Sequence, residues 1–167
     1  PIKSSAASDV YKRQDLYNSL TCGWWKIKGG AVEFNYNDLY NSATCGWWKV
    51  TGGRVDFKFS GFQNYENKWY YLKNGTVNWS YTGLVQYAGT WYYVQKGVLY
   101  WGCNGLVQHN GDWYYIENSA VNWNYTGLVQ YGKSWYYVQK GFLNWNFSGD
   151  VWYNGSQYKV QNGMMVG

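Results

Sequence analysis

The sequence has little of what catalytic, metal-binding and disulfide-bonded proteins require. Its 167 residues include one His, three Cys and one Pro, and only 14% are charged. Three Cys cannot form a disulfide framework, and no two have the CxxC or CxxxC spacing typical of zinc or redox sites. A single His and scattered carboxylates offer few ways to build a catalytic constellation. We therefore expect a binding or structural protein, not an enzyme, with no cofactor and no metal site.

Long hydrophobic runs are also missing. No stretch of about 18 apolar residues occurs, so we expect no membrane insertion. The chain is instead rich in aromatic residues and glycine, with 13 Trp, 20 Tyr, 6 Phe and 21 Gly. Aromatic side chains can bury enough apolar surface to offset the entropy of ordering, which argues against disorder. Because Trp, Tyr, Val and Thr suit strands and Gly disfavours helices, we predict an all-β fold.

Residues 1–14 differ in composition from the rest of the chain, with no Trp and no Gly. They resemble the translated adapter tail of metagenomic reading frames, so we expect a non-native tail on a fragment that has lost its N-terminal domain. This segment carries Lys3, Lys12 and Arg13. The formal net charge of +5 is thus weak support for an anionic partner.

The remainder is a repeat with a period of about 22 residues. Two tryptophan rows keep this period, namely Trp69, Trp91, Trp113 and Trp135, and Trp79, Trp101, Trp123 and Trp145. Seven units follow, at 15–37, 38–60, 61–82, 83–104, 105–126, 127–148 and 149–167, the last with the composition of a cap. Units this small cannot bury a core alone, so the repeats must stack into a solenoid with a shared interior.

Each unit is predicted to be a β-hairpin. Turn pairs such as Asn74-Gly75 and Gly52-Gly53 supply the positive φ of two-residue hairpin turns, and place Leu72 opposite Val77 and Tyr70 opposite Trp79. This register predicts one apolar core face: Trp25, Ile27, Val32, Phe34; Trp48, Val50, Val55, Phe57; Tyr92, Val94, Leu99, Trp101; Tyr114, Ile116, Val121, Trp123; Tyr136, Val138, Leu143, Trp145. The other face would be solvated, with Lys26 opposite Glu33 and Lys49 opposite Asp56.

That other face carries the candidate ligand-binding residues. Each unit has a Trp, a Tyr two residues later and a cross-strand polar partner: Trp69, Tyr71 and Asn78; Trp91, Tyr93 and Tyr100; Trp113, Tyr115 and Asn122; Trp135, Tyr137 and Asn144. Flat rings stack on sugar faces or on a quaternary ammonium, and phenol and amide groups bond hydroxyls. The alternative is that these Trp residues are packed under the connector of the next unit, such as Leu84, Val85 and Tyr87. Both interpretations, ligand contact and packing, hold if one side of each Trp ring is packed and the other side is open.

The unit Gly-Leu-Val-Gln-Tyr-Ala-Gly-Thr-Trp-Tyr-Tyr-Val at 83–94, ending in the turn Gly97, resembles the cell-wall-binding repeats of Gram-positive surface proteins. These include choline-binding modules, glucan-binding YG repeats and clostridial toxin repeats, and the resemblance covers 15–167. The Cys-Gly-Trp-Trp-Lys segments at 22–26 and 45–49 resemble a variant from gut Firmicutes. The resemblance implies a superhelical solenoid of hairpins, without catalysis, that holds a longer secreted protein on the cell wall or a polysaccharide. Choline modules begin each unit with Gly-Trp, whereas this chain has Phe62, Leu84, Leu106 and Leu128 there, which argues against teichoic acid choline among these ligands.

Two other functions stay open. A structural stalk with no ligand would have the same repeats, and single-stranded nucleic acid also stacks on aromatic rows. Because Lys and Arg do not recur with the Trp positions, we expect no nucleic acid partner. His109 stands where other units have Tyr, which indicates a tolerated substitution, and a Cys22–Cys45 bridge between adjacent units is not expected.

Overall fold

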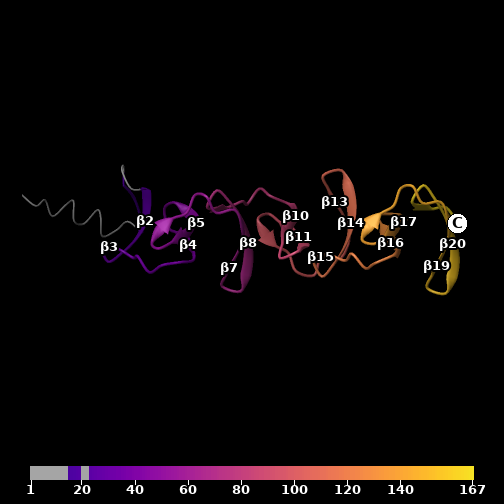
Figure 1. Cartoon of the computed structure of the whole chain (residues 1–167), viewed down its shortest axis with the longest axis horizontal. Helices are drawn as coiled ribbons and strands as arrows, with labels where there is room; N and C mark the ends of the chain where they lie inside the picture. The colour runs from indigo at the N-terminus through magenta and orange to yellow at the C-terminus, as the bar shows by residue number, and fades with distance from the viewer. Residues whose placement is uncertain (1–14, 20–22) are drawn as a thin grey trace, which may run out of the picture. The chain divides into compact units, whose positions relative to one another are not determined.

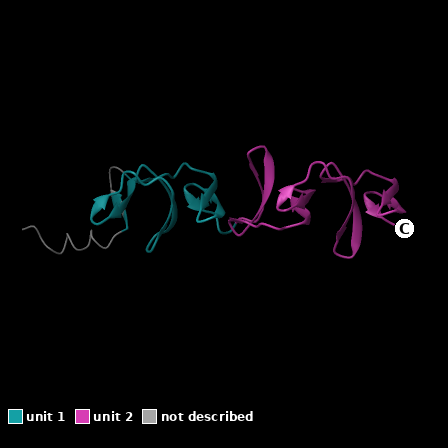
Figure 2. Cartoon of the chain, turned by 90° about the horizontal axis from the view of Figure 1, so that it is seen from below, with its two compact units in different colours: residues 1–80 teal, residues 81–167 magenta. Residues whose placement is uncertain are grey.

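The computed structural model describes residues 15–19 and 23–167, and there every regular element is a β-strand (Figure 1). The predicted tail 1–14 and Cys22 lie outside the described residues. Cys45 and Cys103 carry free thiols. Within the described ranges, no helix has the length and apolar character to cross a membrane. The chain divides into two compact units, residues 1–80 and 81–167 (Figure 2).

The strands follow one another in groups of three, one group in each predicted repeat. Unit 1 contains β1 (Leu16–Ser19), β2 (Gly23–Lys28), β3 (Ala31–Val32), β4 (Leu39–Ser42), β5 (Gly46–Thr51), β6 (Arg54–Val55), β7 (Gly61–Tyr65), β8 (Lys68–Lys73) and β9 (Thr76–Val77). Unit 2 contains β10 (Gly83–Tyr87), β11 (Thr90–Gln95), β12 (Val98–Leu99), β13 (Gly105–His109), β14 (Asp112–Glu117), β15 (Ala120–Val121), β16 (Gly127–Tyr131), β17 (Ser134–Gln139), β18 (Phe142–Leu143), β19 (Gly149–Tyr153), β20 (Ser156–Gln161) and β21 (Met164–Met165).

Within a repeat, the main hairpin is formed by the first two strands. In the fourth repeat β10 pairs antiparallel with β11, from Gly83 opposite Val94 to Tyr87 opposite Thr90. Ala88 and Gly89 between them have φ of 48° and 84°, as two-residue hairpin turns require. The segment 83–87, predicted to be a connector, is therefore a strand. That prediction was wrong because it assigned these residues no pairing partner.

The predicted second hairpin exists but is short. In the third repeat Leu72 lies opposite Val77, which confirms the predicted register. The strand ends there, because the Trp79 N–H bonds the Val77 carbonyl 3.1 Å away and the backbone turns. In the fourth repeat the short strand likewise ends at Leu99, before Trp101, which was predicted to continue the core face. Each repeat thus consists of a long hairpin followed by a two-residue strand.

That short strand joins each repeat to the one before it. In unit 2 Tyr92 of β11 pairs with Ala120 of β15, Tyr114 of β14 with Phe142 of β18, and Tyr136 of β17 with Met164 of β21. In unit 1 β2 pairs with β6 and β5 with β9 in the same way. Along unit 2 the hairpins β13–β14 and β19–β20 point to opposite sides (Figure 1). These contacts confirm a solenoid of stacked β-hairpins within each unit.

The core is formed where the short strand meets the long one. The innermost side chain of six long strands is fully buried, namely Val50, Leu72, Val94, Ile116, Val138 and Val160, whereas Ile27 of β2 is half-buried. Their partners Val55, Val77, Leu99, Val121 and Leu143 are buried too. This half of the predicted core face is confirmed from the second to the sixth repeat, whereas Ile27 and Val32 of the first repeat are only half-buried.

The outer half of that predicted face is largely exposed. Relative exposure is 65% for Phe34, 44% for Phe57, 46% for Trp79, 57% for Trp101 and 49% for Trp145. Placing Phe34, Phe57, Trp101 and Trp145 in the core was therefore wrong, and Trp79, predicted opposite Tyr70, is exposed in the same way. The pairing that would bury them stops two residues before each ring, so the turn carries the rings outward, each with an edge against the aromatic residue of the long strand.

The charged pairs on the opposite face also differ from the prediction. Lys26 and Glu33 form the predicted ion pair. Lys26 is only 7% exposed, however, and its Nζ lies 4.5 Å and 4.6 Å from the ring centres of Tyr36 and Tyr40. The face is therefore not solvated at this point. Lys49 instead donates to Gln63 Oε1 at 2.8 Å.

Candidate ligand-binding site

The outer Trp of a long hairpin meets an aromatic residue at the end of the first strand of the following repeat. Ring centres lie 5.6 Å apart for Trp47 and Tyr65, 5.4 Å for Trp91 and His109, 4.7 Å for Trp113 and Tyr131, and 5.6 Å for Trp135 and Tyr153. The Trp rings are half-buried. These tryptophans are thus packed against the next repeat on one side, as the alternative interpretation of the sequence expected.

An open cavity lies beside the last of these contacts. A space of about 170 Å³ is lined by Leu128, Trp135, Tyr153, Asn154, Tyr158 and Met165, which we call the inter-hairpin aromatic site. Trp135 comes from β17, Tyr153 from the end of β19 and Tyr158 from β20. Two consecutive hairpins therefore supply its walls, and no residue in its lining is charged.

One lining residue of this site, Leu128, is held by the half-buried Tyr125. Leu128 is 1% exposed, and the hydroxyl of Tyr125 donates to its carbonyl oxygen at 2.8 Å. Burial raises the pKa of Tyr125 to about 12, so this donor stays protonated throughout the physiological range. Tyr36 and Tyr81 make the same contact with the carbonyls of Leu39 and Leu84. The leucine at the start of each of these repeats is thus fixed by its own chain.

Equivalent rings gather at other repeats. His109 lies between Trp91 and Tyr114, 6.4 Å from the latter. At Trp47 the ring instead stacks on Tyr70, with centres 5.2 Å apart and planes 27° apart, and Trp79 lies 6.0 Å away. The arrangement recurs, but Trp47 has its face covered by a neighbouring ring, whereas an open cavity lies beside Trp135.

The structure does not bring each predicted Trp, Tyr and polar set onto one site. The tyrosines turn inward: Tyr137 stacks on Phe147 with ring centres 4.0 Å apart, Tyr115 lies 4.0 Å from Tyr125, and Tyr93 packs against the core of Leu84, Ile116 and Val121. Trp69 and Tyr71 both contact Phe62.

The polar partners point to a different place. Asn122 and Asn144 donate through Nδ2 to Glu117 and Gln139, at 2.7 Å and 2.8 Å, and Asn78 Oδ1 accepts from the Ser80 hydroxyl at 2.9 Å. Tyr100 is 51% exposed. In three of the four predicted sets the Trp, namely Trp91, Trp113 or Trp135, contacts the aromatic residue that ends the first strand of the next repeat.

Sequence reasoning missed two walls of the inter-hairpin aromatic site. Tyr153 belongs to a row of aromatic residues with the repeat period, at Tyr65, Tyr87, His109, Tyr131 and Tyr153. That row was available as a signal, but it fell in the segment predicted to be a connector. Tyr158 packs against the core of Leu128 and Val160 and also forms the second wall.

Comparison with known proteins decides the family. The family model of the choline-binding repeat matches four times, at residues 58–78, 80–99, 104–122 and 124–144. The chain belongs to the superfamily of cell-wall-binding repeats. These matches include repeats with Leu at the Gly-Trp position, so Leu84, Leu106 and Leu128 do not exclude the chain from it. A comparison with curated proteins finds no match.

Solved structures of this superfamily are similar to the chain. Choline-binding protein F from Streptococcus pneumoniae is 21% identical with a TM-score of 0.36, over 92% of this chain and 52% of that one. The modular Cpl-1 endolysin complexed with a peptidoglycan analogue is 23% identical with a TM-score of 0.35, over 78% and 37%. The choline-binding domain of Spr1274 from Streptococcus pneumoniae is 25% identical with a TM-score of 0.25, over 65% and 95%. This chain spans about half the length of choline-binding protein F.

Proposed function

We propose that the chain is a non-catalytic binding module that holds a larger secreted protein on the bacterial cell wall. The observation that carries this proposal is the inter-hairpin aromatic site, an uncharged cavity walled by Trp135, Tyr153 and Tyr158. Membership of the cell-wall-binding repeats supports it. The ligand class is a cell-wall polymer that bears a quaternary ammonium group, such as the trimethylammonium group of choline.

The chemistry of the lining favours a quaternary ammonium. The face of an aromatic ring is negative and attracts a cation, and several rings around one cavity form the cage that recognises such ligands. The methyl groups of the ligand would bury against Leu128 and Met165. A primary ammonium or a metal ion would find no carboxylate here, because the polar groups of the lining are the neutral side chains of Tyr153, Asn154 and Tyr158.

Repetition strengthens attachment to a polymer. The Trp contact recurs at Trp47, Trp91 and Trp113, each with an aromatic side chain of the next repeat. Several weak sites along one solenoid act together on a polymeric ligand, because after the first contact the others bind at high effective concentration. An anchoring role therefore needs only modest affinity at each site.

The test is site-specific nuclear magnetic resonance of the Trp135 indole N–H during titration with choline. Tyr153→Leu removes one wall, and we expect it to weaken choline binding at this indole about threefold to thirtyfold, the range for loss of a cation–π contact. Trp152→Ala is the matched control, because Trp152 is the neighbouring residue on β19 and is 72% exposed. No shift of the Trp135 signal, or equal losses in both variants, would contradict the proposed site.

A further inference from the structure

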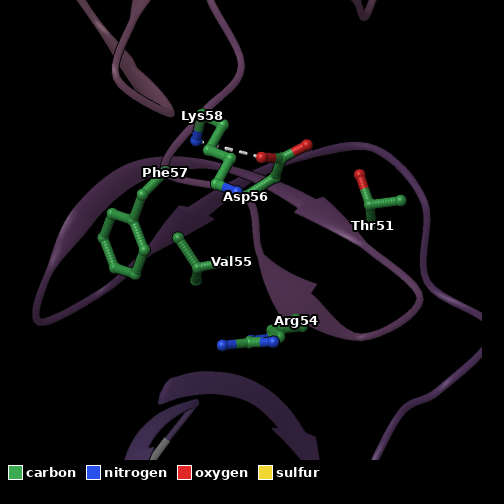
Figure 3. A pocket seen from close by; sticks show the side chains of 6 residues that line it. All are labelled: Thr51, Arg54, Val55, Asp56, Phe57 and Lys58. Atoms are coloured by element: carbon green, nitrogen blue, oxygen red, sulfur yellow. Dashed lines mark hydrogen bonds between the residues drawn. The ribbon is translucent and has the colours of Figure 1, made fainter. Parts of the chain in front are cut away.

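A second kind of cavity recurs on the outside of the repeats, at the turn that follows the short strand. In unit 1 a space of about 380 Å³ is lined by Thr51, Arg54, Val55, Asp56, Phe57 and Lys58 (Figure 3). In unit 2 a space of about 290 Å³ is lined by Glu117, Asn118, Ala120, Val121, Asn122, Trp123 and Asn124. We call each a turn groove. When the repeats are aligned, each lining residue of the second groove except Asn118 matches a lining residue of the first groove.

Both grooves are built on the same backbone turn. Asp56 Oδ1 accepts from the N–H of Lys58 at 3.0 Å, and Asn122 Oδ1 accepts from the N–H of Asn124 at 3.0 Å (Figure 3). A side chain that bonds the backbone two residues on fixes a tight turn. In unit 2 the amide of Asn122 also donates to Glu117 Oε2 at 2.7 Å. The polar side of this groove is thus ordered before any ligand binds.

An aromatic ring forms the other side. Trp123 is half-buried, with its ring perpendicular to Tyr114 at 6.1 Å and tilted against Phe142 at 5.3 Å. Phe57 stands in the same position against Trp48, at 5.5 Å. Neighbouring rings therefore hold each ring in place beside the groove, which gives a flat apolar platform next to polar groups.

The turn groove and the inter-hairpin aromatic site have no lining residue in common. They also differ in chemistry. The aromatic site has rings on several sides and no charge, whereas the groove at Trp123 combines one ring with three Asn side chains and the Glu117 carboxylate.

We infer that the turn groove at Trp123 binds a neutral saccharide. The apolar C–H face of a pyranose stacks on the indole, and Asn118, Asn124 and Glu117 hydrogen-bond its hydroxyl groups. The lining includes a carboxylate and no cation, which disfavours phosphate groups and nucleic acid. This inference does not depend on the proposed choline site, because a different set of residues carries it.

The experiment follows the indole N–H of Trp123 in the whole chain while maltotetraose, isomaltotetraose or chitotetraose is added at millimolar concentration. We expect at least one of the three to shift this signal. Saturating choline should change the affinity by less than about twofold, because the groove is separate. Glu117→Ala and Asn124→Ala each remove a hydrogen-bonding group from an exposed position and should weaken binding about fivefold to tenfold.

Gln108→Ala is the matched control, since Gln108 is exposed on β13 and does not line the groove. Thermal unfolding of each variant verifies that the fold is intact. The inference is overturned if no oligosaccharide shifts the Trp123 signal, if only Trp135 responds, if choline abolishes the shift, or if Glu117→Ala and Asn124→Ala bind like Gln108→Ala. Failure of choline to bind at Trp135 would instead overturn the proposed function alone.

Discussion

Trp135 shows how one residue serves both packing and recognition. It packs against the core that contains Leu128 and Val160, and it also forms a wall of the inter-hairpin aromatic site. Its neighbour on the same strand, Tyr137, is 7% exposed and stacks on Phe147. Side chains two residues apart on a strand share a face, but only the one near the hairpin end reaches the cavity.

The glycines at the tips of four short hairpins, Gly53, Gly75, Gly141 and Gly163, lie close to the backbone of the preceding repeat. Gly141 has φ of +78°, and a Cβ there would lie 2.9 Å from the Asn122 carbonyl oxygen. We expect Gly141→Ala to destabilise unit 2 by about 1–2 kcal/mol for the left-handed conformation and by about 1–3 kcal/mol more for the clash. Chemical denaturation measures both terms together.

Gly155→Ala separates the two terms. Gly155 has φ of +81°, but a Cβ at this position would meet no described atom within 4 Å beyond the adjacent residues. Only the conformational cost should remain. If both substitutions destabilise equally, the close approach between neighbouring repeats does not contribute to stability.

His109 makes stability depend on pH. Its Nδ1 accepts from the Leu84 N–H at 3.3 Å, and burial lowers its pKa below the ordinary value of 6.5. As the pH falls, His109 therefore binds a proton in the unfolded chain at a higher pH than in the folded chain. The stability that is present above pH 6.5 is lost as the pH falls from 6.5 through the lower pKa of the folded chain. We expect the unfolding temperature to fall more between pH 8 and pH 5 in the wild type than in His109→Tyr. Parallel curves would contradict this role.

At the scale of elements, the repeat is a long hairpin with a short third strand. Glycine-containing turn pairs predicted the short hairpin and its register, because positive φ at two successive positions is a strong local signal. The strand 83–87 was missed because the pair Ala88-Gly89 was not recognised as a two-residue hairpin turn, although β11 follows directly after it. Trp101 was assigned to the core by hydrophobicity, but the turn that begins after Leu99 carries it outward.

Leu99 and Trp101 test this description of the element. Leu99 is 7% exposed and Trp101 57% exposed, although both were predicted to be in the core. Leu99→Ala should cost about 2–5 kcal/mol of unfolding free energy, as for other buried leucines. Trp101→Ala should cost about 1 kcal/mol or less, since it removes mainly the edge contact with Tyr92. Denaturant titration checks both, and a larger loss at Trp101 would restore the original assignment.

At the scale of the whole molecule, the period of 22 residues was enough to predict a stack of hairpins. It could not predict which rings meet between repeats, because that depends on how each hairpin is turned relative to the one before. Trp135 and Tyr153 are 18 residues apart in sequence and come within 5.6 Å only through this rotation. The tryptophan row was thus predictable, and the composition of the site was not.

Residues 81–167 should fold without unit 1. The core clusters around Ile116, Val138 and Val160 consist entirely of residues of unit 2. Repeat arrays are stabilised by nearest-neighbour contacts, so removing distant repeats leaves those contacts in place. We expect a single cooperative unfolding transition for this fragment by tryptophan fluorescence and circular dichroism. A gradual, non-cooperative loss of signal would show that the unit depends on the preceding repeats.

The most direct test of the central claim is retention of residues 15–167 on purified Gram-positive cell walls that carry choline, with insoluble α-glucan as a parallel matrix and free choline or sugars as eluents. The proposed function predicts that the chain is retained on the walls and released by free choline. No retention on either matrix would contradict it and leave a structural stalk as the function of the repeats.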